Sequence, residues 1–122
     1  MCGITAFTGQ TSALPFLLQG LEKLEYRGYD SAGVTLVDSQ GLNTYKVKGR
    51  LSDLKEELKH QEHHQTTGIG HTRWATHGVP NDVNAHPHYS ESENIALIHN
   101  GIIENYRVLK DALEENGYTF RS

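Results

Sequence analysis

The sequence predicts an α+β protein built from layers of helices and strands. Short apolar segments of strand length are mixed with amphipathic segments of helical spacing. Two of the strand segments, 34–37 and 44–48, are joined by a Ser-Gln-Gly turn, which indicates local antiparallel pairing. With 122 residues and no internal repeat or low-complexity tract, the chain fits one domain, 1–122, with a core of modest size.

The first third of the chain predicts a strand followed by a helix. Residues 3–8 form a short strand with apolar side chains on both faces. Ser12 suits an N-cap, and Pro15 fits the first helical turn. Five leucines then recur at helical spacing and predict one apolar stripe packed into the core: Leu14, Leu17, Leu18, Leu21 and Leu24.

The middle third predicts a hairpin and a short helix. The hairpin strands follow a turn-rich break, and in the second strand Lys46 and Lys48 are expected to face water. Ser52 is expected to cap a short helix, whose histidine-rich later end is expected to be solvated.

The last third adds two strands and a helix. Strands are expected at 67–73 and 94–99, and Asn105 is expected to cap a helix that ends before Gly117, a glycine in the C′ position. A further strand is expected at 118–120, two residues before the sequence stops. We therefore expect these 122 residues to be the front part of a larger domain.

Charge and cysteine content narrow the class of protein. The formal net charge is −4, from 11 basic and 15 acidic residues, and there is one cysteine. Mild acidity argues against nucleic acid or a membrane surface as a partner. One cysteine cannot form an internal disulfide, and the sequence shows neither a signal peptide nor a membrane-spanning run. These features are typical of a cytoplasmic protein.

Cys2 is the first candidate for chemistry. Removal of the initiator Met1 would leave a thiol and a free α-amine on the same residue, two groups that titrate near neutrality. Such an amine can act as the base for its own side chain. The plain alternative is an inconsequential thiol on a frayed end, but Cys2 leads directly into the strand at 3–8, which would hold it in place.

Two further segments offer hydrogen-bond donors. Asn100 and Gly101 are typical of a turn, yet an Asn amide and a Gly N–H are also the donors that an oxyanion hole needs. In the segment 71–78, Arg73 suits a bidentate grip on a carboxylate, and Trp74 can cap a site against water. Alone, this segment equally fits a surface salt bridge beside a half-buried tryptophan.

Eight histidines raise the alternative of a metal site. His86 and His88 would face one side of a strand, with His71 and His77 near them in sequence. However, Pro87 separates the pair, and no HExxH motif, cysteine pair or acidic ligand cluster accompanies them. We therefore expect neither a metal nor another cofactor.

Five segments in this order resemble the class II, N-terminal-nucleophile glutamine amidotransferases. They are Cys2-Gly3-Ile4, 24–33 (LEYRGYDSAG), 73–78 (RWATHG), 84–88 (NAHPH) and 99–105 (HNGIIEN). The likeness covers the whole chain and is nearest to the members that supply ammonia to a sugar phosphate.

The resemblance implies a role for each matching residue. Cys2, freed of Met1, would attack the side-chain amide of glutamine and form a γ-glutamyl thioester, with its own amine as the base. Asn100 and Gly101 would form the oxyanion hole. The residues that bind glutamine would be Arg73, Trp74, Thr76 and His77. The residues that support the site would be Arg27 and His86.

The fold that the resemblance implies is the αββα four-layer sandwich of N-terminal-nucleophile hydrolases, incomplete in this chain. The implied partners are glutamine and a sugar-phosphate isomerase domain, which would use the ammonia to convert fructose 6-phosphate to glucosamine 6-phosphate in a homo-oligomeric enzyme. Because the family domain is longer, and because a retained Met1 would block the amine, the alternative is a non-catalytic fragment or interaction module.

Overall fold

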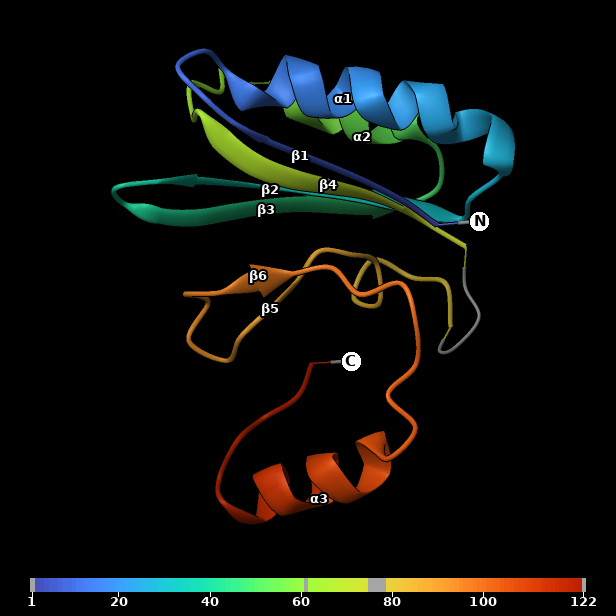
Figure 1. The fold of residues 1–122 in the computed structure, drawn as a ribbon, viewed down its shortest axis with the longest axis vertical. Coiled ribbons are helices and arrows are strands. Elements are labelled where there is room, and N and C mark those ends of the chain that lie inside the picture. The colour runs from blue at the N-terminus through green and yellow to red at the C-terminus, as the bar shows by residue number, and fades with distance from the viewer. Residues whose placement is uncertain (1, 61, 75–78, 122) are drawn as a thin grey trace.

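Four layers follow one another in the computed structural model, which describes residues 2–60, 62–74 and 79–121 (Figure 1). Helices α1 (Ala13–Leu24) and α2 (Leu51–Leu58) cover one face of a four-stranded sheet. The strand pair β5 (His88–Tyr89) and β6 (Ala96–Leu97) lies across the other face, with α3 (Tyr106–Glu115) beyond it. The predicted α+β class is confirmed, and the layers follow the order of an αββα sandwich.

The sheet is antiparallel, with the strand order β1–β4–β2–β3. Its strands are β1 (Gly3–Thr8), β2 (Ser31–Asp38), β3 (Gly41–Lys48) and β4 (Thr67–Arg73). The predictions for the first and last of these are confirmed at both ends. The hairpin strands are longer than predicted, because Ser31 pairs with Lys48 on one side and with Arg73 on the other.

The core lies between the sheet and the helices α1 and α2. Ala32, Val34 and Leu36 of β2 point to this face and are fully buried. The leucine stripe of α1 packs on them, as predicted, with Leu17 and Leu21 fully buried. Strand alternation therefore sends the intervening residues of β2 and β4, including Gly33, to the opposite face.

All three predicted N-caps differ from the structure, and Asn105 occupies the N-cap of α3 without a capping side-chain hydrogen bond. Ser12 occupies the N-cap of α1, but its hydroxyl donates to the carbonyl oxygen of His63 (2.8 Å) and does not bond the helix. Helix α2 begins at Leu51, so the predicted cap at Ser52 is wrong. Its N-cap is Arg50, because the Asp53 carboxylate accepts the Arg50 backbone N–H at 2.9 Å.

Helix α3 ends as predicted, but the strand expected at 118–120 is absent from the described residues. Gly117 adopts a φ of +92°, and its N–H donates to Glu114 O while that of Tyr118 donates to Leu113 O, which is a Schellman motif. The strand expected at 94–99 is limited to Ala96–Leu97, because its pairing partner β5 also has only two residues. Within the described residues no helix is long and apolar enough to cross a membrane.

Lys46 does not face water, in contrast to the prediction. Its Nζ donates to the carbonyl oxygens of Val83 (3.1 Å) and Ala85 (3.0 Å), and it also reaches Pro87 O at 3.4 Å. A half-exposed hairpin arm was expected because the sequence pattern does not show that a second layer covers this face. Segment 82–88 is that cover.

The approach of this segment requires a glycine in β2. A Cβ at Gly33 would overlap the carbonyl oxygen of His86 and press on the side chain of Lys46. The backbone of the second layer therefore lies directly on the sheet at this point.

We expect Gly33→Ala to lower the free energy of unfolding by about 1–3 kcal/mol, the usual cost of overpacking, because the added methyl must push the His86 backbone off the sheet. Thermal or denaturant unfolding of the protein measures this loss. Ser39→Ala, in the exposed β2–β3 turn, is the control and should change stability by less than about 0.5 kcal/mol. Equal stabilities of the two variants would contradict the close approach.

Candidate active site

Cys2 lies where β1 begins, beside the end of β4. The β1–β4 register pairs Gly3 with Thr72, so the residue before Gly3 meets the end of β4. The backbone N–H of Trp74 donates to Cys2 Sγ at 3.4 Å, and Sγ lies 3.6 Å from the Trp74 carbonyl oxygen, to which the thiol donates. The thiol is therefore partly buried and held against the backbone rather than frayed.

Arg73 is the last residue of β4 and is only 7% exposed. Its carbonyl oxygen accepts the N–H of Asp30 at 2.7 Å, which fixes the strand end against the start of β2. Arg73 directly precedes Trp74, and its guanidinium provides a positive charge and a planar set of donors suited to a carboxylate.

Two motifs that are far apart in sequence meet at Trp74. The indole is about half exposed, and its ring edge lies within van der Waals distance of the place where a Cβ on Gly28 would stand. Gly28 adopts a φ of +78° directly after the short 3₁₀ helix Glu25–Arg27. Arg27, predicted to support the site, is partly buried at the end of this helix.

Asn100 is joined to the sheet through His71. Asn100 is exposed, in the segment between β6 and α3, whereas His71 of β4 is completely buried. His71 Nε2 lies 2.6 Å from Asn100 Oδ1. Gly101 follows, and a Cβ there would lie 3.0–3.1 Å from the ring of His99. Asn100, one of the two predicted oxyanion donors, is thus tied to β4, the strand that carries Arg73.

Three histidine rings pack against one another between the sheet and the second layer. The centroid of His86 lies 4.4 Å from that of His71 and 4.2 Å from that of His88. Burial, with the nearby positive charges, lowers the pKa of His86 from 6.5 to about 3 and that of His88 to about 4. Burial also lowers the pKa of His71. The three rings are therefore neutral at physiological pH.

The three rings pack against one another edge-on or tilted. Over the described ranges, no group of three or more His, Cys, Asp or Glu is placed to hold a metal ion. The rings present their faces and edges to one another, whereas metal ligands converge with their nitrogen atoms on one point.

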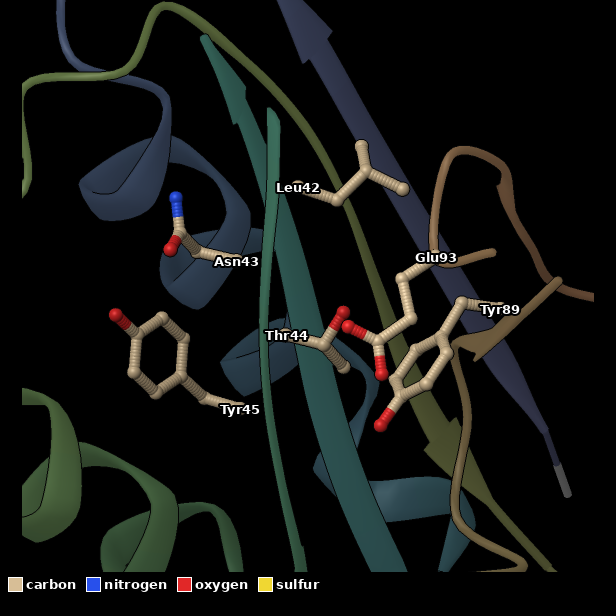
Figure 2. Close-up of a pocket in the computed structure, with 6 residues that line it drawn as sticks. All are labelled: Leu42, Asn43, Thr44, Tyr45, Tyr89 and Glu93. Atoms are coloured by element: carbon tan, nitrogen blue, oxygen red, sulfur yellow. The ribbon is translucent and has the colours of Figure 1, made fainter. Parts of the chain in front are cut away.

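A cavity shown in Figure 2 lies away from these residues, along the edge strand β3. It is lined by Leu42, Asn43, Thr44, Tyr45, Tyr89 and Glu93. Thr44, Tyr89 and Glu93 gather on one side of β3, while Asn43 and Tyr45 point to the other side (Figure 2). This lining contains neither a cysteine nor a histidine. It lies on the part of β3 away from Lys48, which pairs with Ser31, so the cavity is separate from the Cys2 region.

Several site predictions can be compared with the structure. It brings together Cys2, Arg73 and Trp74, with Asn100 linked to the same strand. Thr76 and His77, and also Met1, lie outside the described residues. The structural parts played by His71, Lys46 and Gly33 were not predicted from the sequence. Their signal is the alternation in the strands, which places all three on one face once the register is known.

The Cys2 thiol and the buried Arg73 lie at one end of the sheet in a layered α+β sandwich. The profile of the family described as "Glutamine amidotransferase domain" matches residues 43–122. The chain belongs to this family.

Named relatives match the chain along its whole length. The chain is 59% identical over its whole length to "Glutamine--fructose-6-phosphate aminotransferase [isomerizing]" of Bacteroides thetaiotaomicron, and 57% identical to the protein of the same name from Fusobacterium nucleatum. In both matches the chain spans 20% of the relative, that is, about one fifth of its length.

Solved structures share the fold. Glutamine phosphoribosylpyrophosphate amidotransferase from B. subtilis, complexed with ADP and GMP, matches 98% of this chain and 26% of its own, with a TM-score of 0.79 and 28% identity. A structure described as the allosteric regulatory enzyme of purine biosynthesis matches the same shares with a TM-score of 0.80 and 29% identity. These neighbours confirm the predicted N-terminal-nucleophile hydrolase fold.

The buried, neutral histidine rings make the free energy of unfolding depend on pH. The unfolded chain binds protons at His86 and His88 below about pH 6.5, whereas the folded chain does so only near pH 3–4. The free energy of unfolding should therefore decrease as the pH falls through this interval. Melting temperatures between pH 7.5 and 4.5 measure this slope.

The variant His86→Gln separates this effect from the general titration of carboxylates. It should flatten the slope, because the proton that His86 takes up on unfolding is lost. The control is His60→Gln, at an exposed histidine, which should keep the slope of the unmodified protein. Identical slopes in all three proteins would contradict a neutral buried His86.

Proposed function

We propose that residues 1–122 are the N-terminal part of the glutaminase domain of a glutamine–fructose-6-phosphate aminotransferase. The observation that carries the proposal is the Cys2 thiol, hydrogen-bonded to the backbone of Trp74 next to the buried Arg73. The relatives that share more than half of their aligned residues with this chain carry that name. In the full-length protein, the domain would release ammonia from glutamine.

In the proposed reaction, the Cys2 sulfur attacks the side-chain carbonyl carbon of glutamine. The free α-amine of Cys2 accepts the thiol proton and passes it to the departing nitrogen, so that ammonia leaves and a γ-glutamyl thioester remains. Water then attacks the thioester and releases glutamate and the thiol. The side-chain NH₂ of Asn100 and the N–H of Gly101 would stabilise the oxyanion in both steps. The free amine requires removal of Met1.

Substrate binding follows from the charges near the thiol. Arg73 would hold the α-carboxylate of glutamine through a bidentate pair of hydrogen bonds. Trp74, half exposed next to the thiol, would cover the bound substrate and exclude water. Thr76 and His77 would complete the grip on the substrate. Arg27 would support the site from the 24–33 segment.

His86 would support the site from the second layer, where its ring packs edge-on against that of His71. The remaining partners extend the proposal beyond this chain. Ammonia would pass to a sugar-phosphate isomerase domain that uses fructose 6-phosphate, within a cytoplasmic homo-oligomer. Neither nucleic acid nor a membrane is a proposed partner, and no metal or other cofactor is required by the proposed steps.

We expect Cys2→Ala in the full-length protein to abolish glutamine-dependent formation of glucosamine 6-phosphate, because the variant has no nucleophile. Synthesis with ammonium salt in place of glutamine is the control and should persist. A glutamine analogue with an electrophilic carbon should modify Cys2, as mass spectrometry of the N-terminal peptide would show. Glutamine turnover at normal rate in Cys2→Ala would contradict the proposal and would favour a non-catalytic module.

We expect Arg73→Lys to raise the KM for glutamine by about 10- to 100-fold, since a charge-assisted bidentate pair contributes about 1.5–3 kcal/mol and lysine cannot reproduce its geometry. Glutamine α-amide, which lacks the carboxylate, should be used equally by both forms. Arg107→Lys, at an exposed arginine of α3, is the matched control. A KM that stays unchanged in Arg73→Lys would refute the carboxylate contact.

A further inference from the structure

His71 is a buried histidine that the proposed reaction does not use. It lies on β4, two residues before Arg73 and on the same face of the sheet, and none of its surface is exposed. Its register partners are Ile4 of β1 and Gly33 of β2, so it occupies the middle of the sheet rather than a loop. A polar ring in this place requires a hydrogen-bond partner.

That partner is Asn100. His71 Nε2 and Asn100 Oδ1 are 2.6 Å apart, a short hydrogen bond between the sheet and the segment that follows β6. An amide oxygen can only accept a hydrogen bond, so the proton of the neutral ring lies on Nε2. Among the described residues Nδ1 of His71 has no hydrogen-bond partner, and the contact with Asn100 is therefore the one that selects this tautomer.

The same hydrogen bond decides which end of the Asn100 amide is offered to a ligand. With Oδ1 held by the ring, Nδ2 and its two hydrogens form the end directed away from His71. Within the described part of the chain, this is the hydrogen bond that ties the exposed Asn100 side chain to the protein. A flip of the amide would place its oxygen where a developing negative charge needs a donor.

The ring of His71 is itself held in position. His86 packs against it with the ring planes at 61°, and the backbone of His86 lies directly on Gly33, the register partner of His71. Burial lowers the pKa of His71, and the charge of Arg73 acts in the same direction, so the ring stays neutral with one N–H. A ring fixed in this way can orient its partner.

We propose that His71 is a positioning residue for Asn100, whose side-chain amide it orients so that the NH₂ group serves as an oxyanion donor. This inference rests on the proposed glutaminase function. It adds a residue that acts through Asn100 and that does not touch the substrate. The contribution of His71 to the rate should therefore disappear when the Asn100 side chain is absent.

The test is a double-mutant cycle in the full-length protein. His71→Phe keeps a ring of similar size without the N–H and should lower kcat for glutamine by about 100-fold, as the loss of one oxyanion donor does, with KM changed less than threefold. In the Asn100→Ala background, His71→Phe should have little further effect. His71→Gln, which restores an N–H donor, should recover most of kcat, and His60→Phe, at an exposed site, should not change it.

Two readouts separate positioning from a loss of structure. Alkylation of Cys2 by iodoacetamide proceeds by displacement at carbon without an oxyanion, so its rate should be the same in His71→Phe and in the unmodified protein. Ammonia-dependent synthesis should also persist. A full 100-fold loss in the Asn100→Ala background, or an unchanged kcat in His71→Phe, would overturn the proposal.

A third readout needs no turnover. The ¹⁵N chemical shifts of His71, in protein labelled at histidine, distinguish the two ring tautomers. A proton on Nε2 supports the proposal, and a proton on Nδ1 overturns it, even if His71→Phe does not fold. Absence of glutaminase activity in the unmodified protein would instead refute the proposed function, so the two failures are distinguishable.

Discussion

The antiparallel pairing of β1 with β4 is the constraint on which the site depends. Because Gly3 pairs with Thr72, Cys2 continues the pairing towards Arg73 at the end of β4, and its thiol bonds the backbone of the next residue, Trp74. A slip of the register by one residue would turn every side chain of β1 to the other face. On the helix side, the glycines of β1 and β4 let side chains of α1 pack directly on the paired strands: Gly3, Gly68 and Gly70.

Covering the second face of the sheet creates the electrostatic environment of the site. Segment 82–88 lies on Gly33, and the Lys46 ammonium is bound by three of its carbonyl oxygens. Removal of water from this layer keeps the packed histidine rings neutral. A neutral His71 can donate a hydrogen bond to Asn100 without adding a charge beside Arg73. The polar groups beneath the proposed oxyanion donors are therefore fixed in charge and in orientation.

Much of the fold could be predicted because local patterns dictate it. The leucine stripe of α1, the strands at 3–8 and 67–73, and the end of α3 at Gly117 follow from spacing and from backbone preference alone. The cap of α2 and the ends of the short strands could not be predicted. They depend on a carboxylate that competes for the Arg50 N–H and on the length of the partner strand.

By itself, the sequence determined the class of protein and indicated the residue types of the candidate site, because Cys2, Arg73 and the Asn-Gly pair each carry their chemistry in their side chains or backbone. Only the tertiary structure decided that Lys46 is enclosed and that His71 meets Asn100. Both outcomes come from contacts between residues nearly thirty or more positions apart, across two layers. Such contacts follow from sheet register and layer packing, which local periodicity does not encode.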